Sequence, residues 1–196
     1  MQETSLAPGL LLSMPQLADP NFARAVVLML EHNEEGSFGL IVNHESELPV
    51  SQLLGGIDAT WTGDPDAVVW AGGPVMPGSG WVLHTGSDEL GPVSHTLGGA
   101  LDESGTLRVS EELFMSTSEG NLKILAQHPP KRTRFLLGYS GWGGGQLAAE
   151  MAAGSWLHCD IDLDILFDSP SDEMWYDCLQ SMGLSPESLV QAHGVH

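Results

Sequence analysis

Residues 135–156 read FLLGYSGWGGGQLAAEMAAGSW and constrain the fold more than any other part of the chain. The apolar run at 133–137 is typical of a strand. Five glycines follow within residues 138–145, ahead of a short helix predicted over 146–153. Glycines in a turn before a helix let other groups approach the backbone and leave amide N–H groups unpaired. The segment therefore predicts either an anion or ligand cradle or a closely packed strand–helix junction, because glycine content alone does not separate the two.

Length and hydropathy indicate a soluble globular protein. The 196 residues suit one domain over 1–196 with a full-sized core, and 42% of them are hydrophobic. No run approaches the roughly 18 apolar residues that a membrane helix needs. The first five residues contain no basic group, and Pro8, Gly9 and Pro15 interrupt the leucines that follow. We therefore expect no secretory signal and no membrane segment.

Cysteine usage and net charge bear on the compartment and on the partners. Cys159 and Cys178 form no CxxC motif, and two thiols in a chain of this size favour a reducing cytoplasm over a disulfide scaffold. The chain has 26 acidic and 6 basic residues, a formal net charge of −20. Nucleic acids and anionic membranes are repelled by such a surface. We expect a cytoplasmic protein that binds neither directly.

The few basic residues are concentrated in one place. Four of the six lie between Lys123 and Arg134, and Lys131, Arg132 and Arg134 directly follow two prolines. This cluster is either a local anion site or a solvated strand entry that offsets nearby carboxylates.

Hydrophobic patterns predict a mixture of short strands and short helices, which is an α+β fold without long crossovers. Residues 32–37 read as the longer loop of a hairpin and 85–100 as a loop that could act as a mobile flap. Strands are expected over 24–30, 38–43, 67–71, 81–84 and 107–109. Helices are expected over 50–54, behind a capping box of Ser116 and Glu119, over 146–153 with Gly154 as C-cap, and from about Ser171 to Gly183.

Residues 156–167 alternate between apolar and polar side chains, which predicts a half-buried strand with a carboxylate face. Asp160, Asp162 and Asp164 would then lie along one face. They could hold a hard cation if other oxygens converged there, or form a solvated face.

The established catalytic and cofactor motifs fail one by one. Ser140 lies in Gly-Tyr-Ser, but Trp142 replaces the last glycine of a hydrolase elbow, so a nucleophile and a local turn hydroxyl are the two interpretations. No lysine follows the glycines as in a phosphate-binding loop, and Gln146 breaks a dinucleotide fingerprint. Residues 31–36 imitate a calcium loop but lack its final glutamate, and no zinc pattern is present. We predict no metal and no cofactor.

Three aromatic side chains are candidates for a site. His32 ends a hairpin strand and His84 ends another strand, and each is either an acid–base group or a structural histidine. Trp142, set among glycines, is expected to be partly exposed, so that it either stacks on a ligand or partner or packs against its own loop.

Separate sequence blocks keep one order along residues 7–184. They are APGLL (7–11), MPQL (14–17), DPNF (19–22) with Arg24, EHNEEG (31–36), GLIVN (39–43), GGPV (72–75), VLH (82–84), GYSGW (138–142), and GQL (145–147) with Glu150 and Trp156. As a set they resemble the YqgE/AlgH family of bacterial proteins. The chain departs from the family pattern at His44-Glu45, where Arg-Pro is common, and at Ala25, where Ser or Thr is usual. Because His44 replaces the arginine that is common in the family, an anion-binding role for the hairpin end is weakened.

The resemblance implies a mixed, strongly curved sheet that bifurcates into a pseudo-barrel and is flanked by about four short helices. It implies no catalytic residues, because the family is largely uncharacterised. Members are sometimes named transcriptional regulators. That name comes from a regulatory association with alginate production and not from a recognised DNA-binding motif.

These observations favour a non-enzymatic regulatory protein that binds a small ligand or a protein partner of unknown identity. The alternative is an enzyme acting on a small anionic metabolite with His84 or His32 as acid–base group, and direct DNA binding comes third. Glycines and polar residues at the ends of elements are where sites usually lie. The predicted pocket comprises Arg24, His32, Asn43, Gly72, Gly73, Pro74, His84, Tyr139, Ser140, Gly141, Trp142 and Gln146.

Overall fold

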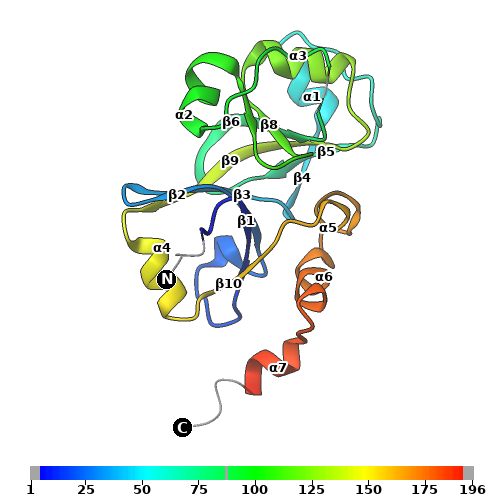
Figure 1. The fold of residues 1–196 in the computed structure, drawn as a ribbon. Helices are drawn as coiled ribbons and strands as arrows, with labels where there is room; N and C mark the ends of the chain where they lie inside the picture. The colour runs from blue at the N-terminus through cyan, green and yellow to red at the C-terminus, as the bar shows by residue number, and fades with distance from the viewer. Residues whose placement is uncertain (1–4, 87, 192–196) are drawn as a thin grey trace.

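One long strand, β9 (Thr133–Gly143), organises the molecule in the computed structural model, which describes residues 5–86 and 88–191. The prediction that there is no secretory signal rests partly on residues 1–4, which lie outside the described part. In Figure 1, strands and helices gather above and below β9. The main path through the sheet is β10-β1-β2-β3-β9-β6-β8-β7.

Below β9, four strands pair in antiparallel order. They are β1 (Gly9–Ser13), β2 (Val26–Asn33), β3 (Gly36–Ile41) and β10 (Trp156–Cys159). The hairpin between β2 and β3 is tighter than expected, because Asn33 pairs with Gly36 and only two residues form its turn. Asn33 Oδ1 accepts hydrogen bonds from the backbone N–H groups of Glu35 and Gly36, which fixes that turn.

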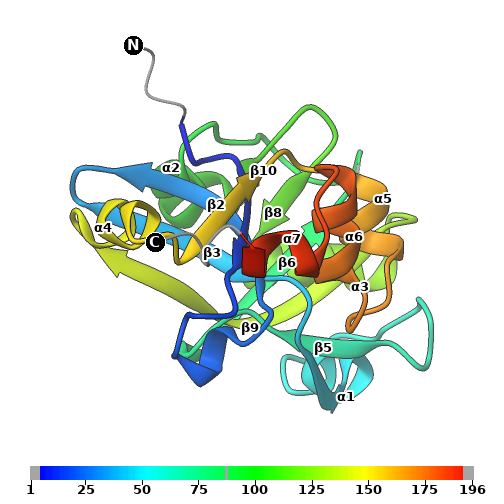
Figure 2. The ribbon, with the colours of Figure 1, turned by 90° about the horizontal axis from the view of Figure 1, so that it is seen from below.

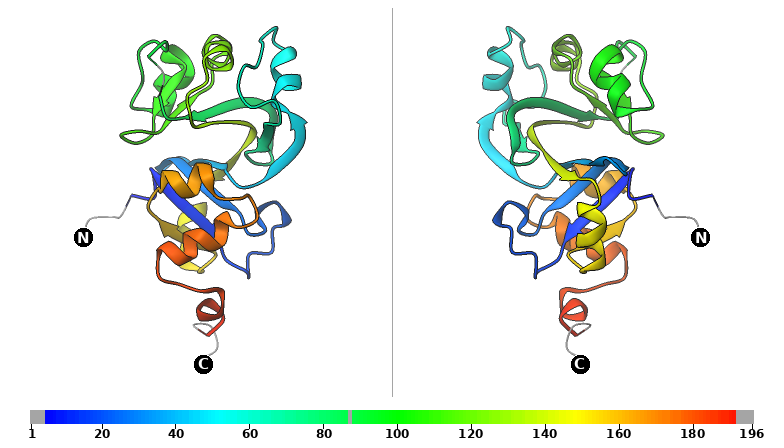
Figure 3. Two further views of the ribbon diagram at one scale, coloured as in Figure 1. Left: turned by 90° about the vertical axis from the view of Figure 1, so that its right-hand side faces the viewer. Right: turned by 90° about the vertical axis from the view of Figure 1, so that its left-hand side faces the viewer.

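Above β9 the sheet forks. The N-terminal half of β9 pairs in parallel with β5 (Val68–Ala71), whereas its C-terminal half pairs with β3. The other edge of β9 pairs with β6 (Val75–His84), followed by β8 (Phe114–Ser116) and β7 (Thr106–Arg108), while β4 (Glu45–Pro49) pairs with β5. This curved, bifurcated sheet confirms the α+β fold that the resemblance implies, and Figure 3 shows its two halves one above the other.

The described residues contain more short helices than the about four expected. The α-helices are α1 (Val50–Gly55), α2 (Leu97–Gly99), α3 (Glu119–Gln127), α4 (Gln146–Ala152), α5 (Leu163–Asp168), α6 (Met174–Ser181) and α7 (Pro186–Gln191). A 3-10 turn, η1 (Pro20–Phe22), and a π-helical turn, η2 (Ala100–Ser104), complete the set. Figure 2 shows α4 on one side of the lower strands and α5 and α6 on the other. Within the described ranges, no helix combines the length and the hydrophobicity needed to cross a membrane.

Three clusters of buried side chains stabilise the fold. The largest runs through both halves, from Leu10 and Leu28 to Leu83 and Met115, so the halves share one apolar interior. A second cluster lies beneath α1 and α3, and a third surrounds Trp142 and Trp156 beside α4.

Several sequence predictions need correction. Residues 156–167 do not form one strand, because Asp162 caps the N-terminus of α5 by accepting from the N–H groups of Asp164 and Ile165. Capping satisfies amide groups that a strand would leave to a neighbour, and the strand ends at Cys159. Ser118, not Ser116, caps α3. The 85–100 segment is not wholly loop, since α2 begins at Leu97, and the 24–30 strand begins only at Val26.

Candidate functional site

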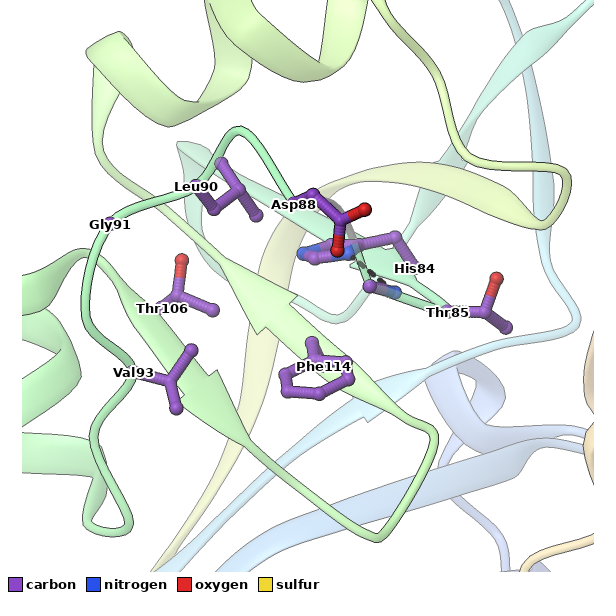
Figure 4. Close-up of a pocket in the computed structure, with 9 residues that line it drawn as sticks. His84, Thr85, Asp88, Leu90, Gly91, Val93, Thr106 and Phe114 are labelled. Atoms are coloured by element: carbon purple, nitrogen blue, oxygen red, sulfur yellow. Dashed lines mark hydrogen bonds between the residues drawn. The ribbon is translucent and has the colours of Figure 1, made fainter.

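A cavity with a polar wall lies at the C-terminal end of β6. It has a volume of about 480 Å³ and is enclosed by His84, by the loop that follows it, and by β7 and β8. Figure 4 shows Leu90, Gly91 and Val93 passing along one side, with Thr106 and Phe114 on the strands opposite. We call it the His84 cavity. The loop is anchored beyond it at Ser94, whose backbone forms hydrogen bonds with Thr106 and Arg108.

His84 begins a chain of buried hydrogen bonds. Its Nδ1 accepts from the backbone N–H of Gly86 at 3.1 Å, so the ring proton is on Nε2, which lies 2.9 Å from Ser116 Oγ. Ser116 Oγ lies 2.7 Å from Thr106 Oγ1, which also accepts from Asn121 Nδ2 at 2.9 Å. Only one hydroxyl of the Ser116–Thr106 pair donates to the other. The second hydroxyl proton has no acceptor among the described residues, and Thr106 is the member of the pair that lines the cavity.

The environment of His84 keeps its ring uncharged. The side chain is fully buried and stacks on Phe114, with ring centroids 5.8 Å apart and an interplanar angle of 17°. Burial away from water lowers the pKa of His84 to about 4, because the imidazolium would lose its hydration there. At neutral pH, His84 is therefore a neutral donor toward Ser116.

The described residues provide no metal centre. They contain no group of three or more His, Cys, Asp or Glu side chains arranged to hold an ion. Asp162 is used as a helix cap, while Asp164 and Asp168 form ion pairs with Arg132 at 2.5 Å. Asn33, at the centre of the calcium-loop imitation, is used by the hairpin turn.

The glycine-rich segment, predicted as a turn over 138–145, is a strand as far as Gly143 and a turn only at Gly144 and Gly145. β9 continues to Gly143, its residues 140–143 pair with β3 as far as Gly36, and the Gly143 N–H donates to Gln146 Oε1. At the fork of the sheet, a Cβ on Gly138 would collide with the Gly73 carbonyl, and one on Gly72 would collide with the Gly138 carbonyl. We call these three residues the glycine seam. Of the two interpretations of the glycine-rich segment, the seam supports close packing of elements.

Trp142 is buried rather than partly exposed, which corrects the sequence prediction. Only 6% of its surface is accessible. Its Nε1 donates to Glu150 Oε2 at 3.0 Å, and its ring packs against Phe22 and Trp156 with centroids 5.9 and 5.8 Å apart. The strand places this side chain in the third hydrophobic cluster, since it points to the face covered by α4.

Ser140 and the Gly72-Gly73-Pro74 turn are close together. Ser140 is fully buried, and its Oγ donates to the Gly72 carbonyl at 3.2 Å, as a local structural hydroxyl does. Tyr139, Gly141 and Trp142 border a separate, open groove of about 460 Å³ beside the β2–β3 hairpin.

Other predicted site residues fall elsewhere in the molecule. Asn43 lies beside Arg24, donating from Nδ2 to the Arg24 carbonyl at 2.9 Å and accepting at Oδ1 from the Val26 N–H at 2.8 Å. His32 borders a cavity of about 410 Å³, and its Nδ1 lies 2.7 Å from Ser37 Oγ. Gln146 accepts from the Gly143 N–H and donates to Glu150. The twelve residues are thus distributed over several cavities and hydrogen-bond networks rather than gathered in one.

The basic stretch is used within the fold. Arg132 pairs with two carboxylates, and these hydrogen bonds and charges raise its pKa. Arg134 is buried, stacks 3.8 Å above the centroid of the Trp70 ring, and donates to the Val42 carbonyl. Burial lowers the Arg134 pKa to about 10.

The two cysteines, which the sequence leaves separate, lie together between β10 and α6. Both are buried, free thiols, and the Cys178 thiol donates to the Cys159 sulfur. This hydrogen bond lowers the pKa of Cys159 and raises that of Cys178.

Sequence reasoning identified His84 but missed its partners. Ser116 was assigned to a helix cap, whereas it stands in β8 and bonds His84. Thr106 and Asn121 are 22 and 37 positions from His84 in the chain, and no local spacing marks them. The one feature that marks them in the sequence is a polar side chain next to apolar residues. This feature becomes informative only once the strand pairing is known.

Comparison with known proteins places the chain in a family. An AlgH-like family model matches residues 10–187. A UPF0301 protein of Myxococcus xanthus is 40% identical over 98% of this chain and 99% of its own length. A UPF0301 protein of Magnetococcus marinus is 35% identical over 99% of this chain and 98% of its own. These names state no activity.

Solved structures agree with the fold. The solution structure of the AlgH protein from Pseudomonas aeruginosa is 35% identical, with a TM-score of 0.74, covering 100% of this chain and 98% of that one. A crystal structure of a Corynebacterium diphtheriae protein, 20% identical with a TM-score of 0.67, covers 92% of this chain and 89% of that one and shares the fold alone. With the family model, the relatives and the solved structure in agreement, this chain belongs to the AlgH-like family.

Proposed function

We propose that this protein is a non-enzymatic binding protein whose ligand, an uncharged or cationic small molecule, occupies the His84 cavity. The observation that carries the proposal is the hydrogen-bond chain from Gly86 through His84 and Ser116 to Thr106, which leaves one hydroxyl proton without an acceptor among the described residues. A buried donor of this kind is costly unless something accepts from it. A ligand carbonyl, ether or hydroxyl oxygen against Thr106 would satisfy it.

The charge of the cavity wall favours an uncharged or cationic ligand over an anion. Among the described residues that line the cavity, Asp88 is the one that is charged at physiological pH, where His84 is neutral because its pKa is about 4. Phe114 and Leu90 supply apolar surface, so the wall combines a hydroxyl donor, an aromatic face and a carboxylate. An anion would be repelled by the Asp88 carboxylate, whereas a neutral or cationic molecule would not.

The geometry weighs against the enzymatic alternative for this cavity. A histidine acting as general base toward Ser116 needs an unprotonated Nε2, but the Gly86 N–H occupies Nδ1 and leaves the proton on Nε2. Of the glycine amides expected to stabilise an anion, the Gly143 N–H donates to Gln146 Oε1 instead. Ser140 is fully buried and donates to a carbonyl.

Direct DNA binding has little support. The chain carries a net charge of −20. In the predicted basic stretch, Arg132 is neutralised by Asp164 and Asp168, and Arg134 is buried over Trp70. Phosphate contacts need cations that face solvent. A regulatory role, a protein partner and a cytoplasmic location remain predictions.

A thermal-shift screen tests the proposal. Uncharged and cationic metabolites should include one that stabilises the protein, and a ligand at 100 times its Kd adds about 2.7 kcal/mol. Thr106→Val, which removes the hydroxyl, should weaken this ligand at least tenfold. Thr117→Val, which removes a hydroxyl bonded to the Gly80 carbonyl outside the cavity, is the matched control. Stabilisation by anions only, or turnover that disappears in His84→Gln, would contradict the proposal.

A further inference from the structure

Another cavity, separate from the His84 cavity, lies where the end of β1 meets α6. It has a volume of about 400 Å³, within the range of small-molecule sites. Met14, Leu17 and Trp175 provide its apolar wall, and Arg24 and Tyr176 stand at its side. Trp175 is buried and its Nε1 donates to the Ser13 carbonyl at 2.9 Å, so its own polar atom is satisfied.

Arg24 provides an unneutralised positive charge at this cavity. No carboxylate forms an ion pair with it among the described residues, although acidic residues outnumber basic ones by 26 to 6. Its guanidinium lies 5.4 Å from the centroid of the Tyr176 ring. By contrast, Arg132 is bound by two carboxylates. The planar guanidinium matches a carboxylate through two parallel hydrogen bonds.

The backbone at Arg24 is held in an unusual conformation. Its φ of 48° lies in the left-handed region, which non-glycine residues rarely adopt. Asn43 maintains it by bonding both the Arg24 carbonyl and the Val26 N–H. Strained residues that the surrounding structure holds in place are concentrated at functional sites. The side chain therefore departs from a fixed point next to the cavity.

Ser13 adds a second polar group. It lines the cavity, is 2% exposed, and its Oγ accepts from the Ala25 N–H at 2.8 Å. Its own hydroxyl proton has no acceptor within residues 5–86 and 88–191. An occupant with a negatively charged oxygen near Arg24 and apolar surface toward Met14 and Leu17 would complement the whole wall.

We propose that this cavity binds a small free carboxylic acid with an apolar body, held by Arg24 at its carboxylate and by Trp175 and Leu17 along its chain. The site differs from the His84 cavity in position and in ligand charge, so the two proposals stand or fall separately. Octanoate is a suitable probe. Octanol presents the same apolar chain without the charge, and acetate presents the charge without the chain.

Titration of the full chain, followed by the indole N–H resonances in an NMR spectrum, tests the proposal. Octanoate should shift the Trp175 resonance saturably and bind at least tenfold more tightly than octanol, whereas acetate should not shift it. Arg24→Asn should lower octanoate affinity at least tenfold, to the level of octanol. Asparagine tolerates the left-handed backbone. Arg24→Gly tolerates it too and gives the same test if the first variant does not fold.

Lys131→Gln is the matched control, because it removes one positive charge from an exposed residue that does not line the cavity. It should leave octanoate binding within twofold of the wild type. Equal binding of octanol and octanoate, unchanged octanoate binding in both Arg24 variants, or equal losses in Lys131→Gln would overturn the proposal.

Discussion

The glycine seam and the His84 cavity contrast in how they use polar groups. At the seam, Gly72, Gly73 and Gly138 bring backbone carbonyls so close that side chains are excluded. At the cavity, larger side chains leave open volume, and a chain of hydrogen bonds ends at its wall. Glycine density therefore reports proximity of backbone to backbone, whereas the candidate site arises from buried polar side chains on separate strands.

Among the variants that test this contrast, Gly138→Ala should lose the most unfolding free energy. Gly138→Ala places a Cβ on the Gly73 carbonyl and forces alanine to a φ of 73°. The left-handed backbone costs about 1–2 kcal/mol, and overpacking adds about 1–3 kcal/mol. Urea denaturation should show a loss of roughly 3 kcal/mol or more of unfolding free energy.

Gly143→Ala is the control in the same strand, because the residue is exposed and a methyl group there would extend into open space. Its stability should be unchanged or higher by about 0.5 kcal/mol. Similar losses in the two variants would mean that the seam is not specially close-packed.

His84 predicts a pH dependence of stability. Its pKa in the folded protein, about 4, lies below the ordinary 6.5. Between these pH values the unfolded chain binds a proton that the folded chain does not, so stability is lost as the pH falls. The difference corresponds to about 3 kcal/mol. His84→Gln removes this loss.

Urea denaturation from pH 7 to pH 4 should therefore move the variant's unfolding free energy, relative to wild type, by about 3 kcal/mol in the variant's favour. The carboxylates titrate in both proteins and cancel in the difference. Parallel curves would show that His84 is not protected from protonation in the fold.

A variant at Glu150 tests how much its hydrogen bonds to two tryptophans stabilise the third hydrophobic cluster. Its Oε2 accepts from Trp142 Nε1 at 3.0 Å and from Trp156 Nε1 at 2.8 Å. Glu150→Ala leaves both indole donors without a partner and should cost about 2 kcal/mol in a thermal or urea unfolding experiment. Glu150→Gln retains one acceptor oxygen and should lose about half as much. If the alanine variant is as stable as wild type, water replaces the carboxylate at both indoles.

The sequence predicts the fold where patterns are local. Residues 67–71 and 50–54 correspond closely to β5 and α1, since an apolar run and a proline at a helix start are read within a few residues. The alternating pattern of residues 156–167 leads to a wrong prediction, because the same aspartates fit both a strand face and the start of a helix. The helix forms because Asp162 accepts hydrogen bonds from the N–H groups of Asp164 and Ile165. Local patterns do not contain that choice.

The candidate site is harder to predict because it depends on strand order. His84 is recognisable as a polar residue at a strand end, but β6 pairs with β8, and β8 with β7, to bring Ser116 and Thr106 to it. The glycine-rich segment likewise reads as a turn until β3 and β9 are paired. Non-local pairing is the information that a single sequence lacks.

The smallest effect is expected at Ser140, which lies beside the glycine seam and whose hydroxyl has either a structural or a chemical role. Its hydroxyl donates to the Gly72 carbonyl at 3.2 Å from a fully buried position. Ser140→Ala should lower the unfolding free energy by about 1 kcal/mol, the usual contribution of one such hydrogen bond. Ser51→Ala, at an exposed position in α1, should change it by no more than about 0.5 kcal/mol. Because the hydroxyl is structural, ligand binding at the His84 cavity should be the same in both variants and in wild type. Loss of binding or of any measured turnover in Ser140→Ala alone would instead place the chemistry of this protein at Ser140, beside the glycine seam.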